Sequence, residues 1–192
     1  MLTMKKRIIV GITGASGIIY GISLLNILKE VSDIETHLII SNAAKLTMQY
    51  ETDLNLNEIK DLADKCYNYN DIAAPIASGS YKTLGMIIVP CSVKTFSEIA
   101  TGVTNSLLTR AADVILKERR KLILMVRETP LHSGHLETLL KLSQLGAIIV
   151  PPVPAFYNNP KTLEELVDYS IIRALDLFDL NIPSPRRWKS EE

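Results

Sequence analysis

Five short runs of apolar residues recur along the chain without the polar alternation of a half-exposed strand. They occupy residues 8–12, 37–40, 86–89, 122–126 and 147–150. Strands of this kind are covered on both faces, as in parallel sheets. Amphipathic segments with helical spacing separate the runs. This alternation predicts an α/β fold in a single domain, with a doubly wound open parallel sheet of the Rossmann or flavodoxin-like type.

Residues suited to helix ends mark several boundaries. Asn105 precedes a helix expected over residues 107–120. Gly146 stands where a left-handed C-terminal cap belongs. At the last helix, Thr162 with Glu165 three residues later predicts a capping box.

Length and charge narrow the class of protein. The chain has 192 residues, of which 47% are hydrophobic, and its 21 basic and 21 acidic residues give a formal charge of zero. Nucleic-acid binders normally carry a basic surplus, so we expect no nucleic-acid partner. Because no repeat or linker interrupts the pattern, we expect one domain over residues 1–180 and an irregular tail over residues 181–192.

Cysteine content and the first residues bear on location. Cys66 and Cys91 are too few for a disulfide scaffold in a chain of this length. The N-terminal residues lack a signal-peptide pattern and the roughly 20 apolar residues of a membrane span. These features predict a cytoplasmic protein without a membrane partner.

A glycine-rich turn, TGASG at residues 13–17, joins the first run to the first helix. Glycine lets the backbone turn tightly, and the exposed amides at a helix start favour an anion. Doubly wound sheets also bind ligands at the carboxyl ends of their strands. The hydroxyls of Thr13 and Ser16 add polar groups, so we interpret the turn as a site for a phosphorylated ligand rather than a tight connection alone.

A nicotinamide-dependent short-chain dehydrogenase is the first alternative, because its glycine turn also begins with Thr-Gly. Such an enzyme needs Tyr and Lys four residues apart on one helix face. Tyr157 and Lys161 have that spacing, but Pro160 between them would break the helix. The second strand ends in Ser41 and Asn42, where an acidic residue should bind the ribose. The sequence does not favour a dehydrogenase.

Nine further segments follow in a recognisable order and spacing. They are ISNAA (40–44), ETD (51–53), ASGS (77–80), PCSVKT (90–95), RAAD (110–113), LKERR (116–120), RETP (127–130), FY (156–157) and PRRW (185–188). With the glycine turn, this set resembles the UbiX-type flavin prenyltransferases, once described as aromatic acid decarboxylases. The resemblance runs from about Arg7 to Trp188, nearly the whole chain.

The resemblance implies an activity and an assembly. It implies one flavin mononucleotide (FMN) site per subunit, with sites formed between the subunits of a homododecamer. The implied reaction transfers a dimethylallyl group from dimethylallyl monophosphate to N5 and C6 of reduced FMN. The product, prenylated FMN, would serve a UbiD-type decarboxylase. Residues 1–180 are then a flavin-binding domain, and the tail contributes to the active site or to a subunit contact.

The charged residues suit such chemistry without a metal. Many prenyltransferases bind a diphosphate through magnesium and a DDxxD motif, whereas Asp61 and Asp64 form an isolated pair on an expected solvated helix face. Arginine and lysine side chains can neutralise a departing phosphate. By resemblance, the prenyl phosphate is bound by Lys117, Arg127, Tyr157 and Arg173. Taken alone, Lys117 is typical of a solvated helix end, and Arg173 lies among apolar neighbours that would partly enclose it.

The resemblance also assigns the flavin site. The implied binding residues are Gly14, Ala15, Ser16, Ser41, Ser92, Thr95, Arg110 and Arg127. Ser92 and Thr95 follow a strand end, so N-capping of a helix is their alternative role. An arginine such as Arg110 is by itself more typical of a surface charge. We expect Cys91 to be a buried small hydrophobe without chemistry.

Two carboxylates are candidates for moving protons. Ring closure removes a proton from flavin C6, and a carboxylate near the leaving phosphate can act as acid or base. We assign this role to Glu128, with Glu51 as a supporting residue and Ser16 as a hydrogen-bonding link between flavin and phosphate. Trp188 would cover the allyl group and stabilise positive charge through its π face, or pack on another subunit.

Other chemistries stay open or are not favoured. His132 and His135 lack the further ligands of a metal site, so no metal is expected. A cysteine decarboxylase of the same fold would use a histidine base and a Pro-Ala-Ser-Ala-Asn-Thr segment, where this chain has PIASGS at residues 75–80. A second alternative is a flavin-binding accessory subunit that stores or delivers the cofactor.

Overall fold

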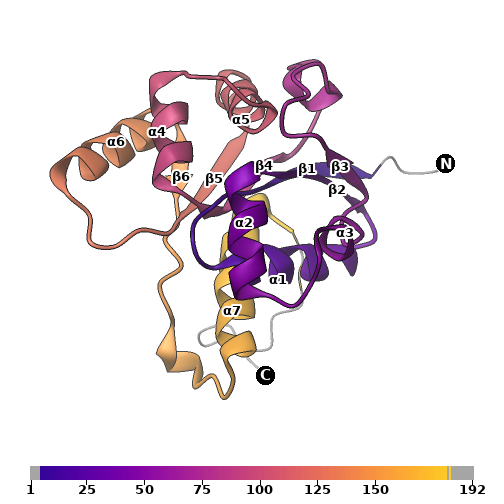
Figure 1. The fold of residues 1–192 in the computed structure, drawn as a ribbon, viewed down its shortest axis with the longest axis vertical. Helices are drawn as coiled ribbons and strands as arrows, with labels where there is room; N and C mark the ends of the chain where they lie inside the picture. Colours follow the sequence, from indigo (N-terminus) through magenta and orange to yellow (C-terminus); the bar gives the residue numbers. More distant parts are fainter. Residues whose placement is uncertain (1–4, 181, 183–192) are drawn as a thin grey trace.

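The computed structural model describes residues 5–180 and residue 182, which form one α/β domain around a six-stranded sheet (Figure 1). The strands are β1 (Lys6–Ile12), β2 (Ile34–Ile40), β3 (Lys65–Tyr67), β4 (Gly85–Cys91), β5 (Lys121–Val126) and β6 (Ala147–Ile149). They pair in the order β3-β2-β1-β4-β5-β6, and every pair is parallel. The predicted doubly wound parallel sheet is confirmed. Apart from residue 182, the expected tail lies outside the described residues.

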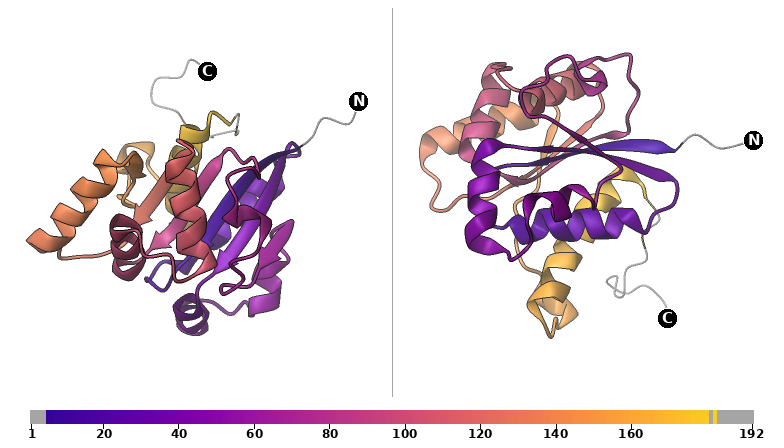
Figure 2. Two further views of the ribbon diagram at one scale, coloured as in Figure 1. Left: turned by 90° about the horizontal axis from the view of Figure 1, so that it is seen from above. Right: turned by 45° about the vertical axis from the view of Figure 1, so that its right-hand side comes forward.

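Helices cover both faces of the sheet, as Figure 2 shows. On one face, buried side chains come from α1 (Ile18–Lys29), α2 (Asn42–Glu51), α3 (Leu56–Lys60) and α7 (Leu163–Leu175). On the other face they come from α4 (Val93–Thr101), α5 (Leu107–Lys117) and α6 (Ser133–Gln144). Three short 3-10 turns are η1 (Pro75–Ala77), η2 (Phe156–Asn158) and η3 (Asp176–Phe178). In the part of the chain that the structure describes, no helix is long and apolar enough to cross a membrane.

Strand β3 is a strand that the apolar pattern did not predict. It has three residues, Lys-Cys-Tyr, and lies at the edge of the sheet, where it pairs only with β2. Two of its residues are exposed, so it leaves no apolar run in the sequence. A strand this short also carries too few positions for a periodic signal.

The boundaries of α5 differ from the prediction. Ser106, and not Asn105, is its N-cap, with its hydroxyl accepting from the backbone amide three residues later. The helix ends at Lys117 rather than at residue 120. Arg119 has a positive φ of 57°, a left-handed conformation that cannot continue a right-handed helix.

Two other predicted helix caps are present, but one of them lacks the predicted capping box. Gly146 has a φ of 103°, which confirms the left-handed position after α6. Thr162 caps α7 by accepting from the amide of Glu165. The Glu165 carboxylate, however, accepts from the amide of Lys161 and not from that of Thr162, so the reciprocal capping box is absent.

The order of the strands creates a position for a ligand. The chain runs from β1 to β2 on one side and then returns to β4 on the other side of β1. The segments leaving β1 and β4 lead to α1 and α4, which cover opposite faces. In doubly wound sheets, ligands bind in the crevice at such a switch point. The TGASG turn and Ser92 follow these two strand ends.

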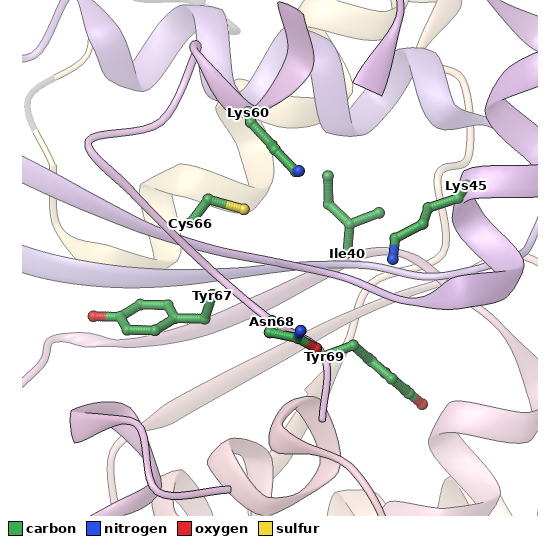
Figure 3. Close-up of a pocket in the computed structure, with 7 residues that line it drawn as sticks. All are labelled: Ile40, Lys45, Lys60, Cys66, Tyr67, Asn68 and Tyr69. Atoms are coloured by element: carbon green, nitrogen blue, oxygen red, sulfur yellow. The ribbon is translucent and has the colours of Figure 1, made fainter. Parts of the chain in front are cut away.

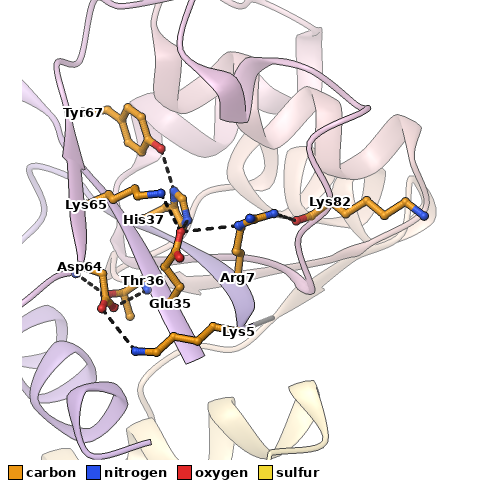
Figure 4. Close-up of polar contacts among 9 residues, drawn as sticks. All are labelled: Lys5, Arg7, Glu35, Thr36, His37, Asp64, Lys65, Tyr67 and Lys82. Atoms are coloured by element: carbon orange, nitrogen blue, oxygen red, sulfur yellow. Dashed lines mark hydrogen bonds and ion pairs between the residues drawn. The ribbon is translucent and has the colours of Figure 1, made fainter. Parts of the chain in front are cut away.

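A polar network lies toward the amino-terminal ends of β1, β2 and β3 (Figure 4). The Glu35 carboxylate is 2.8 Å from Nε2 of His37, 3.0 Å from Nζ of Lys65 and 3.5 Å from Nε of Arg7. The fully buried His37 also bonds the Tyr67 hydroxyl through Nδ1 at 2.8 Å. Burial lowers the pKa of His37 by more than the neighbouring Glu35 raises it. Burial raises the pKa of Glu35, but its bonds to Lys65 and His37 prevail and lower it.

Acid should therefore destabilise the protein first through His37. Between the ordinary pKa of 6.5 and the lowered folded value, the unfolded chain binds a proton that the folded chain resists, so the free energy of unfolding falls with pH. Below about 4.5, Glu35 adds a further loss as its carboxylate is protonated. The variant His37→Gln should reduce the stability difference between about pH 7.5 and about pH 5.5, measured by urea denaturation, by about 1 kcal/mol. An unchanged difference would contradict this role of His37.

Candidate functional site

The TGASG turn is packed closely against the start of α2. A Cβ built on Gly14 would stand 2.4 Å from Cβ of Ala43 and 2.9 Å from its carbonyl carbon. Gly17, the N-cap of α1, has a φ of 106°, which favours glycine. Ser41 caps α2 through its hydroxyl and donates its own amide to the carbonyl oxygen of Ile12 at 2.9 Å. Small side chains thus let the ends of β1 and β2 and the starts of two helices meet.

Backbone amides of the turn are available to an anion. Among the described residues, no group accepts a hydrogen bond from the amides of residues 14–16. The next two amides, those of Gly17 and Ile18, donate to Oε2 of Glu51 at 2.8 and 2.9 Å. The Ser16 side chain also hydrogen-bonds Glu51. Glu51 therefore caps α1, and the three preceding amides are left for an anion, as the helix start favours.

The surroundings of Glu51 favour its ionised form. Partial burial raises the pKa of this carboxyl, but the hydrogen bonds from Ser16 and from the amides of Ile18 and Gly17 prevail and lower it, helped by the charge of Arg127. Arg127 follows β5, so its effect on Glu51 indicates that the end of that strand lies near the glycine turn. Glu51 suits a role as a charged acceptor that holds Ser16.

Replacing Glu51 with Gln should weaken the start of α1. The negative charge at this helix N-terminus is lost, so the free energy of unfolding near neutral pH should fall by about 0.5–1 kcal/mol in urea denaturation. Glu30→Gln is a matched control, because Glu30 is exposed at the C-cap of the same helix, where a negative charge is unfavourable. Equal losses in the two variants would contradict the capping role of Glu51.

Thr13 connects the turn to the end of β4. Its hydroxyl donates to the carbonyl of Pro90 at 2.7 Å and accepts from the amide of Ser92 at 2.8 Å, and the residue is 1% exposed. This hydroxyl is used inside the protein, which corrects its interpretation as a ligand-binding group. Ser92 caps α4, and its hydroxyl lies 3.1 Å from that of Thr95. The capping role of Ser92 is confirmed, and flavin binding by the pair stays a prediction.

Arg127 and Glu128 follow the carboxyl end of β5, on the same side of the sheet as the glycine turn and Ser92. The amide of Arg127 donates to the carbonyl of Cys91 at 3.1 Å, so the segments after β4 and β5 lie side by side. Both predicted side chains are exposed, and Oε1 of Glu128 accepts from the amide of Thr129 at 2.8 Å. Cys91 is fully buried, which raises the pKa of its thiol and agrees with an inert core residue.

Tyr157 and Arg173 line a cavity of about 390 Å³ between α7 and the segment that follows β6. Its apolar wall includes Met125, Ile148, Val150, Pro152 and Val153. The Tyr157 hydroxyl is hydrogen-bonded to that of Tyr169, and the two rings are perpendicular with centroids 6.0 Å apart. The Arg173 side chain is 59% exposed and paired with Asp176, so it is not enclosed as predicted. Tyr169 was not predicted from the sequence, where its one signal is its position four residues before Arg173 on α7.

Lys117 is separated from the glycine turn within one chain. It ends α5, just before Lys121 begins β5. Lys121 is in register with Gly85, which pairs with Ile8 near the amino-terminal end of β1, whereas the turn follows the carboxyl end. A single chain does not bring Lys117 to the turn. Trp188 lies outside the described residues.

Two more predicted charges have partners close by. The Asp64 carboxylate accepts from the amide of Thr36 at 2.8 Å and from its hydroxyl at 3.0 Å, which joins the segment before β3 to β2. This corrects the expectation of a solvated helix face for Asp64. Arg110 is half-buried in the first turn of α5 and pairs with Asp113 at 2.6 Å. Its predicted contact with the flavin stays untested.

The histidines of the loop after β5 form a stacked pair. His132 is the N-cap of α6, and its ring centroid lies 3.5 Å from that of His135, which is in the first turn of the helix. Across residues 5–180 and 182, no group of three or more His, Cys, Asp or Glu side chains is arranged to hold a metal ion.

A smaller cavity, of about 240 Å³, lies at the carboxyl ends of β2 and β3 (Figure 3). It is lined by Ile40, Lys45, Lys60, Cys66, Tyr67, Asn68 and Tyr69. Nζ of Lys45 donates to Oδ1 of Asn42 at 3.1 Å, and burial raises the pKa of the Cys66 thiol. None of the predicted site residues lines this cavity, so it is distinct from the glycine turn.

Known proteins resemble the chain over almost its entire length. Residues 2–174 match the family model described as Flavoprotein. The chain is 54% identical over 186 residues to the flavin prenyltransferase UbiX of Escherichia coli K12, which covers 96% of this chain and 98% of that protein.

Solved structures agree with this relationship. The crystal structure of AnUbiX (PadA1) in complex with FMN and dimethylallyl pyrophosphate has a TM-score of 0.94 and 47% identity, covering 98% of this chain and all of that one. A dodecameric FMN-dependent UbiX-like decarboxylase from Escherichia coli O157:H7 has a TM-score of 0.93 and 48% identity, covering 96% of this chain and all of that one. The fold, the glycine turn and the identity over nearly the full length lead to one conclusion: the chain belongs to the UbiX family of flavin prenyltransferases.

Proposed function

We propose that the protein converts reduced FMN and dimethylallyl monophosphate into prenylated FMN and inorganic phosphate, and that the product serves a UbiD-type decarboxylase. The observation that carries the proposal is the turn at residues 14–16, whose free amides adjoin a Ser16–Glu51 hydrogen bond near the charge of Arg127. The AnUbiX structure contains FMN together with dimethylallyl pyrophosphate, which supports FMN and a dimethylallyl donor of this type as ligands here.

FMN fits the carboxyl edge of the sheet. In this proposal the amides of residues 14–16 hold its phosphate, and Ser41, Ser92, Thr95 and Arg110 bind the rest of the molecule. Reduced FMN supplies nucleophilic positions at N5 and C6. Thr13 supports the site indirectly, because its two hydrogen bonds fix the distance between the turn and Ser92.

Cationic side chains supply the charge that the departing phosphate needs. Arg127 lies near the turn, while Arg173 and Tyr157 share the cavity beside α7. Guanidinium and ammonium groups stabilise a phosphate leaving group without a metal, so we propose a metal-independent reaction. Lys117 would reach the site of a neighbouring subunit, because in its own chain it lies toward the amino-terminal ends of the strands, away from the glycine turn. The dodecameric relative supports such sharing between subunits.

Proton transfer is assigned to Glu128. Its exposed carboxylate follows Arg127 at the edge where both ligands would meet. One carboxylate can take up the proton lost from C6 of the flavin and can also release a proton to the phosphate. Trp188 as a cover for the allyl group and the cytoplasmic location stay predictions.

Mass spectrometry of the flavin tests the proposed reaction. The protein is incubated anaerobically with reduced FMN and dimethylallyl phosphate, and the flavin should gain C5H8 as phosphate is released. A parallel reaction with the diphosphate measures the preference for the donor, and a peptide ending in cysteine tests the decarboxylase alternative. Intact FMN binding without any mass gain would overturn the transferase proposal.

A further inference from the structure

The cavity at the carboxyl ends of β2 and β3 brings two lysines and a cysteine together. Lys45 is the fourth residue of α2, Lys60 is the last residue of α3, and Cys66 is the middle residue of β3. In Figure 3 the two ammonium groups and the thiol point toward the space around Ile40. Three separate elements thus direct polar groups into one small cavity.

The positive charge of this cavity is not balanced by a carboxylate. No aspartate or glutamate of the described residues lines it. In the same part of the chain, the ammonium group of Lys60 has no hydrogen-bond or ion-pair partner, and that of Lys45 donates only to the neutral Oδ1 of Asn42. Both lysines are half-buried, so their charges are partly removed from water. Because like charges at one cavity repel each other, an anion between them would be stabilising.

The thiol of Cys66 is influenced by both lysines. Partial burial raises its pKa, and the charges of Lys60 and Lys45 act in the opposite direction without overcoming that effect. The thiol therefore keeps its proton at neutral pH and supplies no negative charge of its own. The two ammonium groups are left for an anion from outside the protein.

Asn68 adds a neutral donor to the lining. Its Oδ1 accepts from the backbone amide of Asn70 at 3.0 Å, so its Nδ2 group is left to donate. Lysine ammonium groups bind phosphate as point charges. The volume of about 240 Å³ and the apolar side chain of Ile40 leave room for a short organic group beside a phosphate.

We propose that this cavity is a second anion site of the protein, which binds a phosphate group, free or as a small monoester, between the ammonium groups of Lys45 and Lys60. The site is separate from the glycine turn, since no residue of that turn lines it, and the inference does not depend on the proposed function. A phosphate monoester carries between one and two negative charges near neutral pH, which matches two lysines.

Cys66 serves as a reporter inside the cavity. Cys91, the other cysteine of the chain, is fully buried, so the neutral reagent iodoacetamide should alkylate Cys66 alone. At about pH 7.5 the rate follows the thiolate fraction, which nearby lysines raise and a bound anion lowers. In protein loaded with oxidised FMN, about 10 mM inorganic phosphate should slow the alkylation by about 3- to 10-fold, measured by mass spectrometry. The effect should saturate, and sodium chloride of equal ionic strength should slow the reaction by less than about 2-fold.

Replacement of the two lysines tests their part in the site. The double variant Lys45→Gln and Lys60→Gln should be alkylated more slowly without phosphate and should show no further slowing with it. The double variant Lys45→Arg and Lys60→Arg keeps both charges and should keep the protection. Lys141→Gln is the matched control, because Lys141 is exposed on α6 and lines neither this cavity nor the one beside α7.

Dimethylallyl phosphate in place of inorganic phosphate distinguishes the two sources of the group. Half-maximal protection at a lower concentration of the ester assigns the site to a monoester, and the reverse order assigns it to free phosphate. Protection that chloride reproduces, that persists in the double glutamine variant, or that neither phosphate gives would overturn the proposal. A native protein in which Cys66 cannot be alkylated would overturn it as well, because the cavity would then be closed to small solutes.

Discussion

Glu128→Gln is expected to remove most of the prenyl transfer and to leave FMN binding nearly intact. The rate constant should fall by about 10²- to 10⁴-fold, the usual contribution of a positioned acid or base. Glutamine keeps the shape of the side chain and an acceptor oxygen for the amide of Thr129, 2.8 Å away in the native protein. It can neither take up nor release a proton, so proton transfer is the property that the substitution removes.

Single-turnover reactions followed by mass spectrometry of the flavin measure this effect. Protein loaded with reduced FMN is mixed anaerobically with dimethylallyl phosphate, and the appearance of the heavier flavin gives the rate constant. Glu137→Gln is the matched control, because Glu137 is exposed on α6 and belongs to no predicted site. A Glu128→Gln variant that turns over as fast as the control would remove Glu128 from the mechanism.

The sheet could be predicted from the sequence where its strands are buried on both faces. All seven residues of β4 are buried, and their apolar run marks the strand directly. The edge strand β3 has an exposed lysine and cysteine, so hydrogen bonding to β2 defines it and no pattern of hydrophobicity does. The end of α5 was missed for a similar reason, since the left-handed conformation of Arg119 has no sequence signal like a glycine.

The candidate site was predictable in its residue types and much less so in its contacts. The glycine turn and the charged segments could be recognised by their spacing. The hydrogen bonds of Glu51 to the start of α1 span 33 and 34 residues, and those of Thr13 to the end of β4 span 77 and 79, so local sequence patterns do not indicate them. The contact between Tyr169 and Tyr157 could not be predicted, because a tyrosine on an amphipathic helix is an ordinary feature. Its partner comes from the η2 turn, which only the fold brings against α7.

Gly14→Ala is expected to abolish FMN binding at concentrations that saturate the native protein. The added Cβ would stand 2.4 Å from Cβ of Ala43 and 2.9 Å from its backbone carbonyl carbon, and no rotation of a side chain relieves the second contact. Overpacking of this kind costs about 1–3 kcal/mol, and the backbone must move to accommodate it. Because the amides of residues 14–16 move with it, the Kd for FMN should rise by about 100-fold or more, as expected for several lost phosphate contacts.

Two further variants show whether space at Gly14 is the cause. Ala43→Gly in the Gly14→Ala background removes the 2.4 Å contact and leaves the one at 2.9 Å, so FMN affinity should recover in part. Gly102→Ala is the matched control, since a Cβ there meets nothing within 4 Å although its φ is 73°. It should lower stability by about 1 kcal/mol in urea denaturation and leave the fluorescence titration with FMN unchanged. Loss of FMN binding in Gly102→Ala would point to general destabilisation, whereas a loss confined to Gly14→Ala, with recovery by Ala43→Gly, ties FMN binding to the close approach of the turn and α2.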